Sequence, residues 1–257
     1  KFNIWLKMIE TLLNNNRETI KKFAVMCFNT DAFWWREYYS PNNQSNVGDF
    51  IEYADRLSLM GATDLGLALK IASRPQWLKN NASSKTLFLL SDGDASWGED
   101  NLYQLSKAVP SADKIFAFTT GLSGTDTRVL DHLCRQTNGA VFSVLNEEEA
   151  EKVAHAIKYQ PWRISSIRLK EGNDILIAGR PYNIFPGQKL LITGRGNVNS
   201  GDEVVIKVQQ GSIERSIIIP AKLIVESNLT QRIYGQVSVS QLEDFSFKTE
   251  TASIKYA

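Results

Sequence analysis

The stretch Thr86-Leu-Phe-Leu-Leu-Ser-Asp-Gly93 decides the fold that the sequence predicts. A short, continuous apolar run that stops at polar residues and a glycine is typical of a strand buried on both faces of a parallel sheet. Similar runs at residues 23–28, 115–118 and 140–144 predict three further strands of the same kind. The first part of the chain is therefore expected to hold a buried sheet.

Helical patterns alternate with these strands. Apolar residues recur at intervals of three and four, which places them on one face of a helix. The pattern is present at residues 2–13, 50–57, 65–72, 129–134 and 150–157. Strands that alternate with helices of these lengths predict the α/β class, with a mostly parallel sheet and right-handed crossovers. We assign residues 1–160 to this domain.

From Pro161 onward the pattern changes. Short β-type runs broken by Gly, Pro and Asn predict a smaller, β-rich domain over residues 161–257, joined to the first at residues 159–163. Apolar residues at 233–245 suggest a C-terminal helix, although Val-Ser-Val-Ser at 237–240 would equally suit a strand. The expected runs lie at residues 164–170, 174–178, 189–193, 203–209 and 216–219.

Composition excludes several classes of function. The chain has 257 residues, is 43% hydrophobic and carries a net charge of +1, so it lacks the electrostatic signature of a nucleic-acid or anionic-membrane binder. Its longest apolar runs are too short to cross a bilayer, and no signal peptide is visible at its start. Cys27 and Cys134 lie in apolar runs, which indicates buried thiols. Two histidines nearly exclude a zinc site.

Both ends of the sequence are abrupt. A helical pattern begins at Lys1 without a capping residue, and the residues up to Ala257 carry no stop signal. We therefore expect a piece of a longer polypeptide, with frayed natural termini as the alternative.

Two side chains are candidate metal ligands. Asp92 comes directly after a buried strand, and Thr63 lies in a loop just before a helix. Ligands of parallel α/β sheets collect at the carboxyl ends of the strands, and a carboxylate with a hydroxyl suits Mg²⁺, Mn²⁺ or Ca²⁺. The alternative is that Thr63 only caps its helix and that Asp92 only forms an Asx-turn.

Three segments carry a resemblance to a known family. They are Gly61-Ala-Thr-Asp-Leu-Gly-Leu-Ala-Leu69, Leu87-Phe-Leu-Leu-Ser-Asp-Gly93 and the stretch from Thr119-Thr-Gly-Leu-Ser to Asn138-Gly-Ala-Val-Phe142. In order and spacing they resemble von Willebrand factor type A domains. The resemblance implies a Rossmann-like, mostly parallel sheet with helices on both faces. It also implies that Thr63 and Asp92 match two ligands of the metal-ion-dependent adhesion site, which binds Mg²⁺ or another divalent cation.

One part of the family pattern is absent. The first strand and its Asp-x-Ser-x-Ser motif, which supplies the other ligands, should lie immediately before Lys1. In the family this strand lies centrally, between the strands that here are residues 23–28 and 86–90. Each buried backbone group left unpaired costs about 1–3 kcal/mol. We therefore expect an upstream strand or a second chain to fill that position.

The second half also resembles a known family. Tyr182-Asn-Ile-Phe-Pro-Gly-Gln-Lys-Leu-Leu-Ile-Thr-Gly-Arg195 is similar to a segment that follows the A domain in inter-alpha-trypsin inhibitor heavy chains and their bacterial relatives. Residues 232–243 resemble their next helix, which favours a helix there. The resemblance implies a non-enzymatic interaction or adhesion module that binds an acidic residue of a protein partner, with a divalent cation. An extracytoplasmic location is favoured by this resemblance and by no other feature of the sequence.

Two other functions remain open. Asp92-Gly-Asp94-Ala-Ser96 approximates the motif of haloacid dehalogenase-type phosphotransferases, which predicts a Mg²⁺-dependent phosphatase with Asp92 as nucleophile and Asp94 as acid/base. That motif normally closes the first strand of its domain, whereas a strand and several helices precede it here. The other possibility is a structural scaffold with a vestigial metal site. Four aromatic residues form either an exposed binding stripe or packing in the core or at a domain interface: Trp34, Trp35, Tyr38 and Tyr39.

Overall fold

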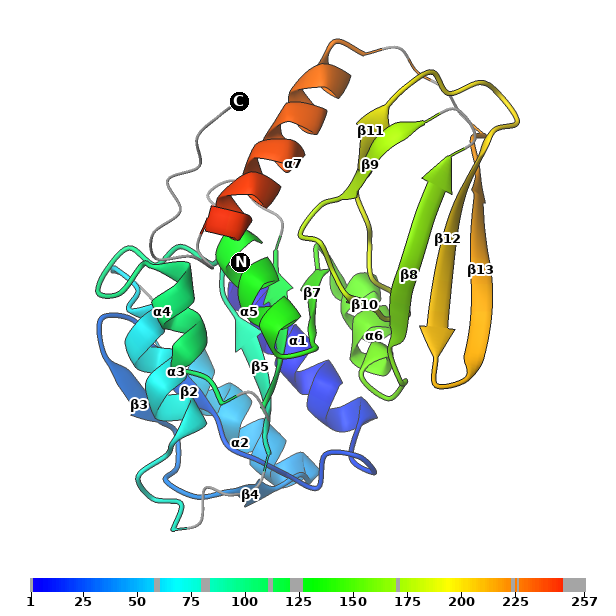
Figure 1. Ribbon diagram of the computed structural model, residues 1–257. Helices are drawn as coiled ribbons and strands as arrows, with labels where there is room; N and C mark the ends of the chain where they lie inside the picture. Colours follow the sequence, from blue (N-terminus) through cyan, green and yellow to red (C-terminus); the bar gives the residue numbers. More distant parts are fainter. Residues whose placement is uncertain are drawn as a thin grey trace. The chain divides into compact units, whose positions relative to one another are not determined.

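The computed structural model describes residues 2–57, 61–79, 84–110, 113–120, 127–169, 172–222, 225 and 227–246 (Figure 1). The chain forms two compact units. Unit 1 is Lys1–Tyr159 with Pro186–Gln188, and unit 2 is Gln160–Phe185 with Lys189–Ala257. Unit 1 is of the α/β class, as expected, with a parallel sheet flanked by helices. Unit 2 is rich in antiparallel strands.

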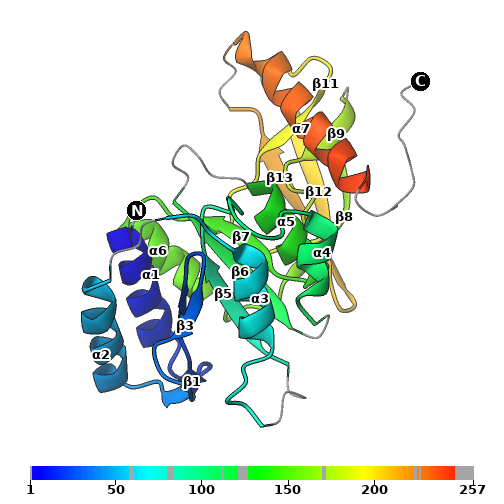
Figure 2. The same cartoon turned by 90° about the vertical axis from the view of Figure 1, so that its left-hand side faces the viewer.

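The parallel sheet of unit 1 has the order β5-β6-β7. Its strands are β5 (Thr86–Leu90), β6 (Lys114–Thr119) and β7 (Ala140–Ser143). Figure 2 shows α1 and α6 on one face and α4 and α5 on the other. These helices are α1 (Phe2–Asn15), α4 (Leu102–Lys107), α5 (Thr127–Gln136) and α6 (Glu147–Ala156).

The central strand explains why this sheet forms. All residues of β6 after Lys114 are buried, because β5 and β7 pair with its two edges. The ring of Phe118 stacks on Phe142 of β7 at 5.8 Å and on Phe88 of β5 at 6.2 Å. An apolar run with neighbours on every side therefore becomes the core of unit 1.

A tight connection brings β7 beside β6. Asn138 has a left-handed backbone conformation with φ of 55°, and the Gly139 N–H donates to the Cys134 carbonyl at 2.8 Å, which ends α5. A Cβ at Gly139 would overlap the Ile115 carbonyl group. Only glycine lets these two segments of the backbone approach this closely.

The prediction of one buried strand at residues 23–28 is wrong. The run divides into β1 (Lys22–Phe23), which pairs antiparallel with β4 (Ser40–Pro41), and β2 (Met26–Phe28), which pairs antiparallel with β3 (Ala32–Trp34). The cause is a hairpin: the Asp31 N–H donates to Asn29 Oδ1 and the Asn29 N–H to the Asp31 carbonyl, both at 2.8 Å. The hairpin folds the chain back along β2, whose residues stay half-buried.

Two strands of unit 1, β2 and β5, each pair with one neighbour within the described ranges. Over the ranges that the structure describes, β2 pairs with β3 and β5 pairs with β6, and no pairing joins β2 to β5. Only Leu89 of β5 is buried, in contrast to the five buried residues of β6. The expectation of a further strand between β2 and β5 stays a prediction.

The aromatic residues that follow β2 are mostly packed inside unit 1. Trp35 contacts Phe23 and Phe50 of α2 (Gln44–Asp55), with ring centroids 6.2 and 5.5 Å apart. Trp34 and Tyr39 both pack edge-to-face against Trp77, at 5.2 Å. Tyr38 alone of the four is exposed, at 54%. The other three are half-buried and packed against neighbouring rings, so the packing interpretation is correct for them.

Unit 2 contains a four-stranded antiparallel sheet in the order β10-β8-β12-β13. Its core is made by Ile184, Ile206 and Val208, and a second strand pair joins β9 to β11. The strands are β8 (Trp162–Leu169), β9 (Asn173–Ile177), β10 (Asn183–Ile184), β11 (Ile192–Arg195), β12 (Glu203–Gln210) and β13 (Ile213–Pro220).

The ambiguous C-terminal pattern of unit 2 is a helix, α7 (Leu229–Ser246). Its Tyr234 hydroxyl accepts from Arg195 Nε at 3.0 Å, and Gln241 donates to the Ile177 carbonyl at 3.0 Å. These bonds attach α7 to β11 and β9. No helix within the described ranges is both long and apolar enough to cross a bilayer. The abrupt C-terminal residues noted in the sequence lie outside the described ranges.

Candidate functional site

Three loops of unit 1 meet at the carboxyl ends of β2 and β5. The Asp64 N–H donates to the Asn29 carbonyl, just after β2, at 2.7 Å. The Thr63 N–H donates to Ser96 Oγ at 3.0 Å, and the Trp97 N–H donates back to the Thr63 carbonyl at 3.1 Å. We call residues 29–31, 61–64 and 91–98 together the loop face. It is the position where ligands of α/β sheets collect.

Thr63 does not cap the helix that follows it. The N-cap of α3 (Leu65–Ser73) is Asp64, whose Oδ1 accepts from the Leu67 N–H at 2.8 Å. The backbone N–H and carbonyl of Thr63 both bond to the loop after β5. The capping interpretation of Thr63 is therefore wrong, and its half-buried side chain belongs to the loop face.

Asp92 is fixed by a local turn. Its Oδ1 accepts from the Asp94 N–H at 3.4 Å, as an Asx-turn requires, and the buried Ser91 accepts from the Gly93 N–H at 3.0 Å. Gly93 has φ of 81°, which only glycine adopts readily. An Asx-turn is thus present and holds the half-buried Asp92 at the end of β5, while its role as a metal ligand stays a prediction. Asp94 is exposed.

The donor atoms fit a divalent cation in kind but not in number. Hydroxyl and carboxylate oxygens are the ligands that Mg²⁺ and Mn²⁺ prefer. Across the described residues, however, no three His, Cys, Asp or Glu side chains gather closely enough to hold a metal ion. Thr63 and Asp92 therefore do not form a complete site by themselves.

Sequence reasoning missed the residues that hold the loop face together. Ser96 accepts from the backbone N–H of Thr63, and Trp97 donates to the Thr63 carbonyl. Gly98 has φ of 74°, and a Cβ there would overlap the Asp64 carboxylate. The available signal was a tryptophan followed by glycine in an otherwise polar loop, since glycine often marks a close approach of two backbones.

The chain is similar to proteins of known description. No family model matches it. Over 97% of its length it is 20% identical to inter-alpha-trypsin inhibitor heavy chain H2 of Mus musculus, of which it spans 29%. Its fold is similar to that of a von Willebrand factor type A protein from Catenulispora acidiphila, with a TM-score of 0.49, 14% identity, and coverage of 94% of this chain and 66% of that one.

A second solved structure with a similar fold is that of proximal thread matrix protein 1 from the mussel byssus, which has a zinc-occupied metal-ion-dependent adhesion site. Its TM-score is 0.44, its identity 14%, and the match covers 60% of this chain and 41% of that one. The match to heavy chain H2 spans both units, as the resemblance noted in the sequence predicts. The chain thus consists of an α/β unit and a β-rich unit, and over nearly its whole length it is similar to a segment of inter-alpha-trypsin inhibitor heavy chain H2.

Proposed function

We propose that unit 1 is a non-enzymatic protein-interaction module that binds its partner with the loop face. The observation that carries this proposal is that hydrogen bonds join the three loops of this face. Asp64 bonds to Asn29 of the first loop, and Thr63 bonds to Ser96 and Trp97 of the third. Loops held together on a rigid sheet present a preorganised surface, which is how binding sites are commonly built on α/β folds.

In this proposal a divalent cation takes part in binding. Thr63 and Asp92 supply two oxygen ligands, and an acidic residue of the protein partner completes the coordination. Because two side chains are few ligands, this chain alone should bind the ion only in the millimolar range, as sparse oxygen sites do. The affinity should rise when further oxygen ligands are added.

A strand from outside these residues is the proposed source of those ligands. The edge of β5 that faces away from β6 and the edge of β2 that faces away from β3 have no recorded pairing in the described part of the chain. The apolar composition of β5 suits a position inside a sheet, and an unpaired apolar edge is a template for another strand. A strand followed by Asp-x-Ser-x-Ser would bring three oxygen side chains to the loop face.

A titration with Mn²⁺ tests this proposal. The ion is added to the chain alone, and then in the presence of a synthetic peptide of about five β-branched apolar residues followed by Asp-Gly-Ser-Gly-Ser. We expect weak binding without the peptide and at least tenfold tighter binding with it. Thr63→Ala and Asp92→Asn should each abolish the gain.

The matched control is Asp100→Asn, which removes an exposed carboxylate outside the loop face and should keep the full gain. A peptide with its last five residues scrambled should give none. The proposal is wrong if the intact peptide gives no gain, or if the gain survives both Thr63→Ala and Asp92→Asn.

The phosphatase alternative has its own test. We expect no turnover of p-nitrophenyl phosphate with Mg²⁺ by the purified chain. Turnover that is lost in Asp92→Asn and in Asp94→Asn would overturn the non-enzymatic proposal and support the hydrolase, because those residues would be nucleophile and acid/base.

A further inference from the structure

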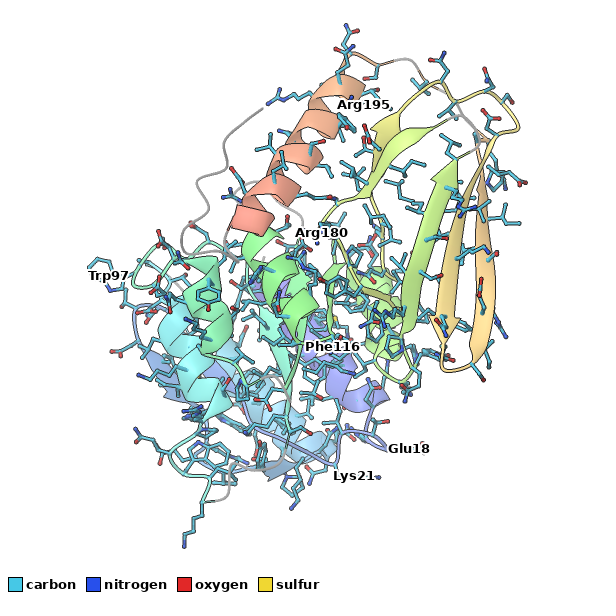
Figure 3. The ribbon with its side chains drawn as sticks, in the orientation of Figure 1. Glu18, Lys21, Trp97, Phe116, Arg180 and Arg195 are labelled. Carbon is cyan, nitrogen blue, oxygen red and sulfur yellow. The ribbon has the colours of Figure 1, made fainter. Side chains whose placement is uncertain are left out.

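Trp97 is the exposed tryptophan of the chain. Its side chain is 62% exposed, whereas the other five tryptophans are at least half-buried. Figure 3 shows it directed away from the ribbon of unit 1. Leaving so large an apolar surface in water is unfavourable, and tryptophan is enriched among the residues that carry most of the energy of protein interfaces.

The backbone of Trp97 is held on both sides. Its own N–H bonds to the Thr63 carbonyl at 3.1 Å, and the preceding Ser96 accepts from the Thr63 N–H at 3.0 Å. The following Gly98 lies against the Asp64 carboxylate, which also caps α3. The indole is therefore presented from a fixed point, which lowers the entropy that a binding event must overcome.

The charges around Trp97 indicate the chemistry of what it contacts. Asp94, Glu99 and Asp100 are exposed, and no Lys or Arg occurs between Lys85 and Lys107. These carboxylates lie within three positions of Trp97 in the same loop, and Glu99 also accepts from the Asn101 N–H at 2.9 Å. An exposed indole in an acidic loop favours a cation, because the ring face attracts guanidinium and ammonium groups and the carboxylates complement their charge. An aliphatic side chain would gain nothing from those charges.

We propose that Trp97 is a recognition residue of the loop face and that it takes an arginine or lysine side chain of the protein partner. This inference rests on the proposed function, since it adds a second contact to the same face. The cation stacks on the indole, and the neighbouring carboxylates complement its charge. The partner segment thus carries a basic side chain near the acidic residue that the metal ion would bind.

The test measures binding of a short peptide without any metal ion. An acetylated Gly-Arg-Gly-Arg-Gly amide is titrated into the chain in EDTA while the indole N–H resonance of Trp97 is followed, with Trp97→Phe used to assign it. We expect a saturable shift with a dissociation constant in the millimolar range. The same peptide with citrulline in place of arginine, equal in shape but uncharged, should bind at least fivefold more weakly.

Variants separate recognition by Trp97 from loss of structure. Trp97→Ala should weaken binding of the arginine peptide at least fivefold, as measured by calorimetry, with an unchanged melting temperature. Tyr159→Ala removes another exposed aromatic residue, at 57%, and should leave binding unchanged. Asp94→Asn combined with Asp100→Asn should weaken binding about twofold to fivefold, because the complementary charge is reduced.

Equal binding of the citrulline and arginine peptides would overturn the cationic preference, and unchanged binding by Trp97→Ala would overturn the role of Trp97. Both results are independent of the Mn²⁺ titration, because the peptide assay contains no metal ion. Failure of the metal-dependent proposal and failure of this inference are therefore distinguishable.

Discussion

Strands β6 and β13 are both rich in apolar residues, yet β6 is almost wholly buried and every residue of β13 is exposed. β6 pairs on both edges, with β5 and β7, and helices cover its faces. β13 pairs with β12 on one edge, and its Ile217, Ile218 and Ile219 are 39–54% exposed. The difference teaches that the place of a strand in its sheet, more than its hydrophobicity, sets how much apolar surface it buries.

The face of β13 that points toward the core of unit 2 makes this concrete. In the register of the sheet Ile167, Ile206 and Ile217 lie side by side on neighbouring strands. Ile206 is 1% exposed and Ile217 is 39% exposed, although the two residues are direct partners on neighbouring strands. The paired position on β12, which has a strand on each side, is buried, whereas the position on the edge strand β13 is at the surface.

The largest effect is expected from truncation in β6. Phe118→Ala removes a fully buried ring that contacts Phe88 and Phe142, so the free energy of unfolding should fall by about 3–5 kcal/mol. Chemical denaturation followed by circular dichroism measures the loss. A cost below about 1 kcal/mol would contradict the assignment of β6 to the core.

A second substitution compares two glycines, one beside each strand. Gly139→Ala places a methyl group into the Ile115 carbonyl, and overpacking of this kind costs about 1–3 kcal/mol. Gly211→Ala, in the turn between β12 and β13, meets no atom within 4 Å but keeps φ at 59°, which costs about 1–2 kcal/mol. Replacing each glycine by asparagine distinguishes the two mechanisms in thermal melts. Asparagine tolerates a left-handed conformation, so it should rescue position 211 only.

Strand β2 is intermediate between β6 and β13, and its Cys27 gives a pH-dependent test. Burial raises the pKa of the Cys27 thiol to about 11. The folded state therefore keeps this proton at pH values where the unfolded chain has lost it, so stability falls as the pH rises from about 9 toward 11. Cys27→Ala should show a shallower decline of unfolding free energy over that range. Equal slopes for the two proteins would indicate that Cys27 is accessible to water.

The smallest effect on stability is expected at β13. Ile218→Lys changes a side chain that is 54% exposed, so the free energy of unfolding should change by about 0.5 kcal/mol or less. Aggregation on warming, measured by light scattering, should slow, because a charge on an edge strand opposes pairing between copies. Ile206→Lys, in the buried neighbour β12, is the contrast and should unfold unit 2. If Ile218→Lys were as damaging, β13 would not be an exposed edge.

Much of unit 1 could be predicted because the evidence for it is local. Residues 86–90 form β5 as expected, and α6 is capped by Asn146, whose side chain accepts from the Glu149 N–H at 2.9 Å. The run at residues 23–28 was predicted wrongly, because its hydrophobicity does not reveal the hairpin that Asn29 and Asp31 create. The sequence predicts Thr63 and Asp92 as candidate ligands, which stays a prediction. It does not reveal the bonds from Ser96 and Trp97 to Thr63, since they join residues more than 30 positions apart.

The sequence by itself determined the alternation of strands and helices, the change of pattern at Pro161, and the turn that holds Asp92 after β5, because each depends on residues close together in the chain. Only the tertiary structure decided which strands are buried, that the backbone of Thr63 bonds to the loop after β5, and that Trp97 stands exposed beside Thr63. These features depend on which distant segments come into contact. Periodicity cannot encode such contacts, because a residue's burial and its long-range hydrogen bonds are properties of its neighbours in space.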